Sequence, residues 1–105
     1  MANGEYQCVL VDRVLYQNGT EHRFADFLKD VVLPFVPWVG LKIFDEFWDD
    51  GEGFTVYGIT WDTKKSRFEL QVWQPSGKPY VADDFESEKA HYISAGWRPW
   101  SSADE

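Results

Sequence analysis

A predicted hairpin in residues 54–74 constrains the fold of this chain more than any other feature. In its second strand, Phe68, Leu70 and Val72 alternate with polar residues, which is the two-residue period of a half-buried strand. A four-residue loop at 63–66 pairs the large apolar side chains as Trp61/Phe68, Ile59/Leu70 and Tyr57/Val72. Because a slip of one residue would scatter these side chains over both faces, the pattern predicts this register, with the apolar face in the core.

The opposite face of the predicted hairpin changes from polar to apolar along its length. Its pairs run from the turn outward as Asp62/Arg67, Thr60/Glu69, Gly58/Gln71 and Val56/Trp73. The apolar far end, around Val56 and Trp73, is where an exposed functional surface would lie. Alternatively, the C-terminal part of the chain covers this end, and the pattern leaves both arrangements open.

The N-terminal residues 5–16 (EYQCVLVDRVLY) predict a strand buried on both sides, because both alternating faces are apolar apart from Asp12 and Arg13. We expect this strand to lie next to the hairpin. The following Asn18-Gly19 is a strong turn signal that could close a two-residue hairpin with a returning strand.

Residues 20–33 instead favour an amphipathic helix. Phe24, Phe27, Leu28 and Val31 follow one another at helical spacing. Thr20 is an acceptable N-cap, and Pro34 ends the element. We expect this helix to cover the face formed by Tyr57, Ile59 and Trp61.

The remaining elements complete an antiparallel sheet. Residues 39–43 predict a third strand of the same meander, with Leu41 opposite Ile59 and Ile43 opposite Tyr57. A short fifth strand is expected at 79–83, where its proline suits a sheet edge. The predicted fold class is α+β: a three-strand meander plus an N-terminal strand, packed by one amphipathic helix.

A second helix is expected near the C-terminus. It begins at Asp83 or Asp84, reaches about Ala95 and takes Gly96 as its C-cap. Trp97 and Trp100 then dock back onto the sheet. The whole chain, 1–105, forms one domain with a frayed tail at about 101–105.

Charge and composition narrow the classes of function. Eighteen acidic and ten basic residues give a net charge of −8, which disfavours direct binding to nucleic acid and favours basic or cationic partners. We predict a cytoplasmic protein without membrane contact. The reasons are the single cysteine, the lack of an apolar leader at the N-terminus and the lack of an apolar run of membrane length. Nineteen aromatic residues, six of them Trp, are many for a core of this size, so we expect some to line an interface.

No motif for catalysis, metal or cofactor emerges from the sequence. The acidic cluster at 45–52 lacks the spacing of a calcium loop and is typical of a solvated turn. His22 and His91 have no third ligand at suitable spacing, and Cys8 lies on a buried strand with nothing beside it to activate the thiol. We therefore predict no catalytic, cofactor or metal site.

The candidate binding surface combines apolar side chains of the second sheet face with nearby carboxylates. It comprises Phe44, Glu46, Trp48, Asp49, Asp50, Phe54, Val56 and Trp73. Aromatic rings beside anions attract cations, and an exposed apolar patch of this kind also marks protein interfaces.

Three functions fit this surface. The first is a noncatalytic interaction module that binds a basic or apolar protein surface or forms a homodimer. The alternative is a domain that binds a cationic or aromatic small molecule in a pocket between helix and sheet. A small carboxylate-dependent enzyme has the least support, because no acid/base pair can be identified from spacing alone.

Overall fold

The computed structural model describes residues 4–18, 21–44, 53–72, 81–82 and 85–101 of the 105-residue chain. Its strands are β1 Tyr6–Asn18, β2 Glu21–Leu33, β3 Lys42–Ile43, β4 Phe54–Thr55, β5 Gly58–Asp62, β6 Arg67–Gln71, β7 Val81–Ala82 and β8 Arg98–Pro99, and its helix is α1 Phe85–Ser94. The main sheet has the order β5-β6-β1-β2-β8, and β7 also pairs with β1. The α+β class is therefore correct, but strands dominate the described residues.

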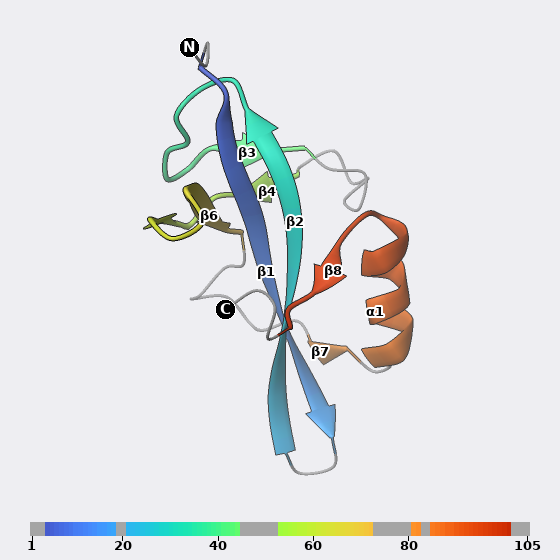
Figure 1. Cartoon of the computed structure of the whole chain (residues 1–105). Helices are drawn as coiled ribbons and strands as arrows, with labels where there is room; N and C mark the ends of the chain where they lie inside the picture. The colour runs from blue at the N-terminus through green and yellow to red at the C-terminus, as the bar shows by residue number, and fades with distance from the viewer. Residues whose placement is uncertain (1–3, 19–20, 45–52, 73–80, 83–84, 102–105) are drawn as a thin grey trace.

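A long antiparallel hairpin, β1–β2, forms the axis of the molecule (Figure 1). Each strand has 13 residues, and they pair without interruption from Tyr6↔Leu33 to Asn18↔Glu21. The register leaves two residues, 19 and 20, for the connection, as the Asn18-Gly19 turn signal indicates. The helix predicted over 20–33 is therefore wrong, and the returning strand is correct.

The apolar residues of β2 have a helix-like spacing because this strand carries apolar side chains on both faces. Phe27 and Leu28 are adjacent in sequence, lie on opposite faces and are both buried. A strand that is buried on both faces loses the strict alternation that distinguishes it from a helix. The unbroken ladder with β1 then outweighs local helix propensity, which is a weak determinant when tertiary pairing is available. Pro34 still ends the element, because β2 stops at Leu33.

The sheet is mixed, in contrast to the predicted antiparallel arrangement. The edge of β1 opposite β2 receives two parallel strands in succession: β6 pairs with Cys8–Val11 and β7 pairs with Leu15–Tyr16. Alternation of side chains is the same in parallel and antiparallel strands, so sequence pattern carries no information on this choice. As predicted, β1 lies next to the hairpin and is buried on both faces, with Val9 and Leu10 almost fully enclosed.

The hairpin β5–β6 has the predicted register from Asp62↔Arg67 to Gly58↔Gln71. Beyond this point the prediction of Tyr57 opposite Val72 is wrong. The Tyr57 amide donates to the Gln71 carbonyl at 2.8 Å, so Tyr57 and Gly58 both oppose Gln71 and form a β-bulge. A bulge adds one residue and reverses the alternation before it. Val56 therefore points into the core and Tyr57 points outward.

The predicted third strand is shorter than expected and lies in a separate sheet. Two-residue strands β3 and β4 pair as Lys42↔Thr55 and Ile43↔Phe54, instead of extending β5. Leu41 is hydrogen-bonded to Val56, whose amide donates to its carbonyl at 2.8 Å. The bulge at Tyr57 explains the difference, because it turns the chain before β5 out of line with the main sheet.

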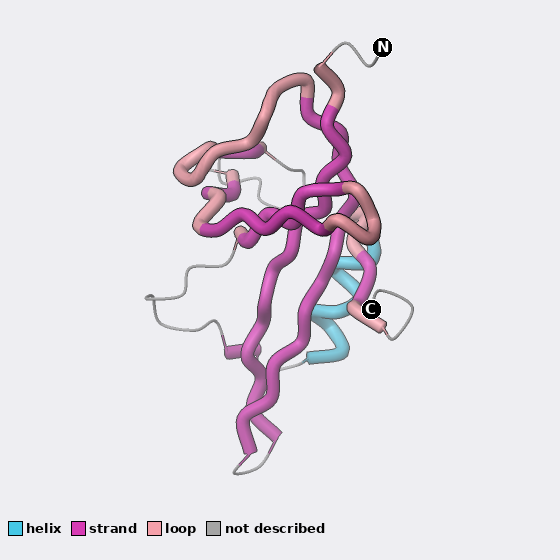
Figure 2. Tube along the Cα trace, turned by 60° about the vertical axis from the view of Figure 1, so that its left-hand side comes forward, coloured by secondary structure: helices cyan, strands magenta, loops and turns pink. Residues whose placement is uncertain are grey.

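Helix α1 occupies the stretch in which the second helix was expected, and it is the only helix in the described residues. The C-cap prediction at Gly96 is confirmed: Gly96 has φ +91°, its amide donates to Ile93, and the Trp97 amide donates to Tyr92. These two bonds form a Schellman motif. The chain then returns along β2, where β8 pairs antiparallel with Phe27 and Leu28 (Figure 2).

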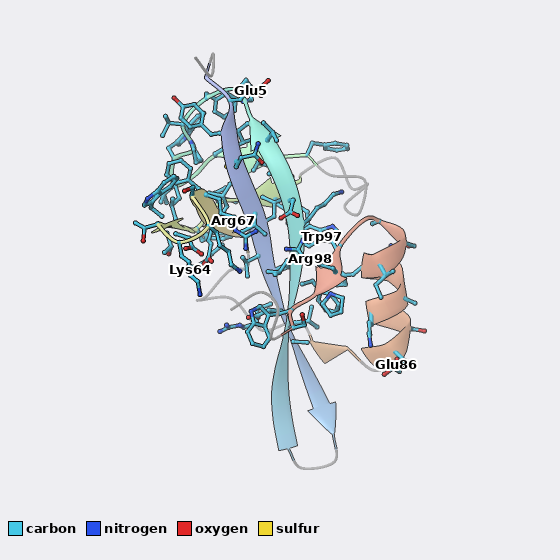
Figure 3. All side chains as sticks on the ribbon, in the orientation of Figure 1. Glu5, Lys64, Arg67, Glu86, Trp97 and Arg98 are labelled. Atoms are coloured by element: carbon cyan, nitrogen blue, oxygen red, sulfur yellow. The ribbon has the colours of Figure 1, made fainter. Side chains whose placement is uncertain are left out.

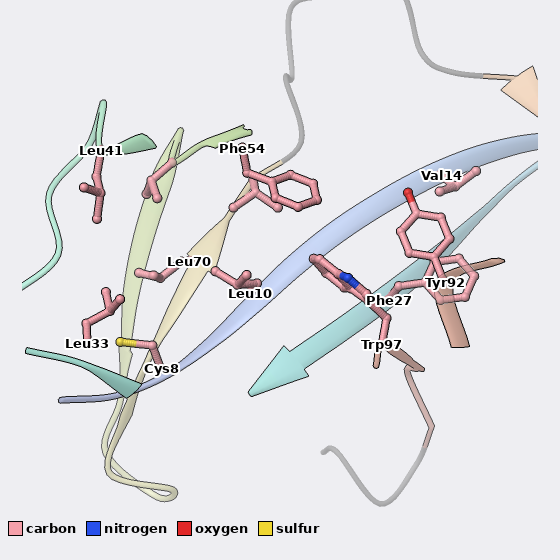
Figure 4. Close-up of a cluster of buried hydrophobic side chains, with 12 residues drawn as sticks. Cys8, Leu10, Val14, Phe27, Leu33, Leu41, Phe54, Leu70, Tyr92 and Trp97 are labelled. Atoms are coloured by element: carbon pink, nitrogen blue, oxygen red, sulfur yellow. The ribbon is translucent and has the colours of Figure 1, made fainter. Parts of the chain in front are cut away.

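The core extends along one face of the β1–β2 hairpin. Leu10 lies between an aliphatic group, with Leu33, Leu41 and Leu70, and an aromatic group, with Phe27, Phe54, Tyr92 and Trp97 (Figure 4). The hairpin face predicted to be core is only partly so. Leu70 and Val72 are buried, whereas Trp61 is exposed because β5 is an edge strand and no helix of the described residues covers it. Tyr57, which the bulge turns outward, is exposed as well.

The Schellman motif gives a direct test of how α1 ends. Replacing Gly96 with Ala should lower the free energy of unfolding by about 1–2 kcal/mol, because an L-residue resists a positive φ. The Gly96→Asn variant should lose less, since Asn tolerates this conformation better. Urea unfolding followed by circular dichroism measures both, and equal stability of all three proteins would contradict the assigned cap.

Candidate functional site

Two residues of the predicted binding surface are buried in the core. Phe54 and Val56 are 4% and 0% exposed and belong to the core, whereas Phe44 is 68% exposed. The reversal of alternation at the bulge accounts for the burial of Val56. The other members of the predicted surface lie outside the described residues: Glu46, Trp48, Asp49, Asp50 and Trp73.

Aromatic rings from α1 and the C-terminal segment enclose Phe54. Trp97 packs against Phe54, with ring centroids 5.3 Å apart, and meets Tyr92 edge-on. Tyr92 in turn stacks on Phe27, with centroids 4.2 Å apart and planes only 4° from parallel. These rings fill the space between α1 and the sheet (Figure 4). The C-terminal segment therefore covers Phe54. Trp73, at the far end of the predicted hairpin, lies outside the described residues.

Arg98 and Trp100 continue the docking of the C-terminal segment. Arg98 binds the Asp30 carboxylate at 3.1 Å, and the Trp100 amide donates to the Asp26 carbonyl at 2.8 Å. Trp100 itself remains half exposed. The prediction that Trp97 and Trp100 dock back onto the sheet is therefore confirmed, although only Trp97 becomes part of the core.

A buried carboxyl group lies beneath α1. Asp12 is 7% exposed, and the Tyr92 hydroxyl donates to its Oδ2 at 2.7 Å. Burial raises the pKa of Asp12 from 3.8 to about 6, and the Tyr92 hydrogen bond only partly offsets this effect. In the sequence, Asp12 is an exception in an apolar strand, and this exception is the available signal. It could not identify Tyr92, which is 80 residues away along the chain.

The opposite face of the β1–β2 hairpin carries ion pairs. Arg13 and Asp26 are cross-strand neighbours and form a two-bond contact, with its shorter distance 2.7 Å. Asp30 pairs with both Arg67 and Arg98, so three strands meet at this carboxylate. Figure 3 shows the two arginines beside the β1–β2 hairpin. These groups are partly exposed, which limits each pair to roughly 0–1 kcal/mol and favours a structural role.

Among the described residues, a group of exposed apolar side chains lies in the connection between β2 and β3. Phe35, Val36, Trp38 and Val39 form this loop patch, and each is more than two-fifths exposed. The rings of Phe35 and Trp38 are 5.4 Å apart. The loop arches away from the β1–β2 hairpin near one end of the molecule (Figure 1). The predicted strand at 39–43 includes Val39, so the sequence pattern does not reveal the loop patch. The available signal is the uncharged run of residues 33–41.

The backbone holds the loop patch in a defined position. The Leu41 amide donates to the Trp38 carbonyl and closes a turn with Gly40 at φ +98°, as a type II turn requires. The Gly40 amide and the Leu41 carbonyl both bond to Val56, which is fully buried. Trp38 and Val39 are thus presented outward on a turn that is anchored to the core.

Within the described residues, no group of three or more His, Cys, Asp or Glu side chains could hold a metal ion. No helix in this part of the chain is long and apolar enough to cross a membrane. Cys8 is buried, which raises the pKa of its thiol and keeps it protonated. Comparison with protein-family models, curated proteins and solved structures gave no match.

Two phenylalanines of the predicted surface should now respond differently to truncation. Phe54→Ala should lower the free energy of unfolding by about 3–5 kcal/mol, because it leaves a cavity beside Trp97. The matched change Phe44→Ala removes an exposed ring and should change stability by no more than about 0.5 kcal/mol. Denaturant unfolding of both variants measures this difference, and similar losses at the two positions would contradict the placement of Phe54 in the core.

Proposed function

We propose that this protein is a noncatalytic interaction module whose loop patch, Phe35, Val36, Trp38 and Val39, binds a basic protein surface. The observation that carries the proposal is the exposure of these four neighbouring apolar side chains on an anchored turn. Contiguous exposed apolar side chains commonly mark interaction sites, and aromatic residues are enriched at the centre of protein interfaces.

The rigidity of the turn supports binding as its role. Side chains that are already held in place lose less conformational entropy when a partner packs against them. Pro34 and Pro37 further restrict the loop backbone, and the two bonds to Val56 attach it to the core. A loop without function would not need to hold Trp38 and Val39 out in water.

The charge of the chain favours a basic partner. The loop itself is uncharged, but the whole chain carries a net charge of −8. The sequence that follows β3 contains five acidic residues and no basic residue between positions 45 and 52. Such a distribution attracts a positively charged surface and speeds its encounter with the loop patch. A second copy of this chain would bring the same net charge, so electrostatic repulsion disfavours self-association.

The small-molecule alternative has lost its expected site. It required a pocket between the sheet and a helix over 20–33, and this segment is β2. The contact that α1 makes with the sheet is filled by the rings of Phe27, Tyr92 and Trp97. The interaction module is therefore the function that we retain.

The proposal can be tested with defined peptides. A Lys/Leu-rich amphipathic peptide should bind this protein, and a charge-matched Glu/Leu-rich peptide should not, because only the first combines apolar and positive groups. The double variant Trp38→Ser/Val39→Ser should weaken binding about tenfold or more, since it removes the apolar centre of the contact. Isothermal titration calorimetry at low and high salt measures the affinity and its electrostatic part.

Trp61 provides the matched control for this experiment. It is an equally exposed tryptophan on β5, four residues beyond Tyr57. Trp61→Ser should leave peptide binding unchanged. Equal loss from both variants, or equal binding of the acidic peptide, would overturn the proposal. Sedimentation that showed a dimer dissociated by the Trp38/Val39 change would identify a second copy as partner instead, and patch-dependent binding to neutral lipid vesicles would identify a membrane.

A further inference from the structure

Asp12 stands at the contact between β1 and α1 and has no part in the proposed binding surface. Its carboxyl group shares a sheet face with Phe27, its cross-strand partner, and with Leu10 and Val14 on its own strand. All three are buried. The side-chain hydrogen bond that reaches this carboxyl comes from Tyr92 of α1, at 2.7 Å. The Tyr92 hydroxyl and the backbone amide of Arg13 thus solvate an acid in an otherwise apolar site.

The charged groups around Asp12 do not neutralise it. On β1 and β2, Arg13 is paired with Asp26 on the opposite face, and the charge of Asp26 acts against ionisation of Asp12. Lys29 of β2 donates to the Ala95 carbonyl at the end of α1.

The described elements on the far side of Asp12 place no cationic group against it either. On α1, Lys89 is partly buried and His91 is exposed, while Arg98 of β8 binds Asp30. Within the described residues, no cationic side chain forms an ion pair with Asp12.

We propose that Asp12 and Tyr92 make α1 a pH-sensitive latch, which is held against the sheet while Asp12 is protonated and loosens when Asp12 ionises. The protonated carboxyl is neutral and can remain in the apolar site at little cost. The carboxylate regains its hydration only if Tyr92 and the helix that carries it move away. The latch is independent of the loop patch, which is anchored through Val56 and not through α1.

The direction of the effect follows from the two pKa values of Asp12. The group titrates near 3.8 when hydrated and at about 6 when the latch is closed. Well below its hydrated pKa of 3.8, Asp12 is protonated in both states and opening is least favourable. The closed state alone keeps its proton between pH 4 and 6, so opening becomes easier as pH rises through this range and levels off above it. The opening equilibrium should rise about fifty-fold from pH 4 to pH 7.5.

Opening of the latch would expose a second apolar surface. Phe27 and Trp97 are held beneath α1 by ring contacts with Tyr92 and are almost fully buried in the closed state. Both would meet water when the helix leaves. The protein would therefore present more aromatic surface at neutral than at acidic pH.

Amide hydrogen exchange measured from pH 4 to 7.5 tests the latch. The amides of Ala95 and Trp97, bonded to His91 and Tyr92, report on α1, and the β1–β2 ladder reports on global unfolding. After correction for intrinsic exchange rates, the opening constant of α1 should rise about fifty-fold in the wild type and stay flat in Asp12→Asn, which mimics the protonated acid. The ratio of the two proteins isolates Asp12 from the other carboxylates.

Tyr92→Phe provides a second variant that keeps the ring stack on Phe27. It removes the only hydroxyl that favours ionised Asp12, so the midpoint of the pH dependence should move to higher pH. The same pH dependence in wild type and Asp12→Asn would overturn the latch. So would equal opening free energies for α1 and the β1–β2 ladder at every pH, or an Asp12 carboxyl carbon that titrates near pH 4 in the nuclear magnetic resonance spectrum.

Discussion

The uninterrupted ladder between β1 and β2 is the interaction on which the rest of the structure depends. Its 13 residue pairs join two segments that are adjacent in sequence, so the loop-closure entropy is small and backbone hydrogen bonds accumulate along the whole hairpin. The other strands of the main sheet attach to this pair directly, except β5, which joins through β6. The strands β6 and β7 take the free edge of β1, and β8 takes the free edge of β2. One face of the same hairpin receives α1 through Phe27.

A single added residue decides which side chains before β5 are buried. The bulge at Tyr57 and Gly58 turns Val56 inward and Tyr57 outward. Val56 then holds the turn of the β2–β3 loop by two backbone bonds. The presentation of Trp38 and Val39 to solvent therefore depends on a local irregularity in a neighbouring strand. This dependence connects the proposed binding surface to the packing of the core.

The two proposals concern two apolar surfaces of one small domain, one exposed and the other buried. The loop patch is permanently exposed, and we infer that a basic partner covers it. The aromatic group beneath α1 is buried, and its burial depends on keeping a proton on Asp12. In both places the structure departs from a rule that ordinary cores follow, either by exposing large apolar side chains or by enclosing an acid. Such departures are where function is expected in a domain whose other choices agree with its fold.

The sequence by itself determined the short-range features of this protein. The β5–β6 register, the buried N-terminal strand, the helix near the C-terminus and the cap at Gly96 all follow from alternation, spacing and turn residues within a few positions of one another. Tertiary structure alone decided three others. Residues 21–33 form a strand because pairing with β1 outweighs a helix-like spacing. The sheet is mixed, and side-chain alternation carries no information on strand direction. Asp12 contacts Tyr92, which is 80 residues away along the chain. The burial of Phe54 was missed for the same reason. Whether Phe54 faces water depends on a bulge and on Trp97, and neither is visible in the pattern around Phe54.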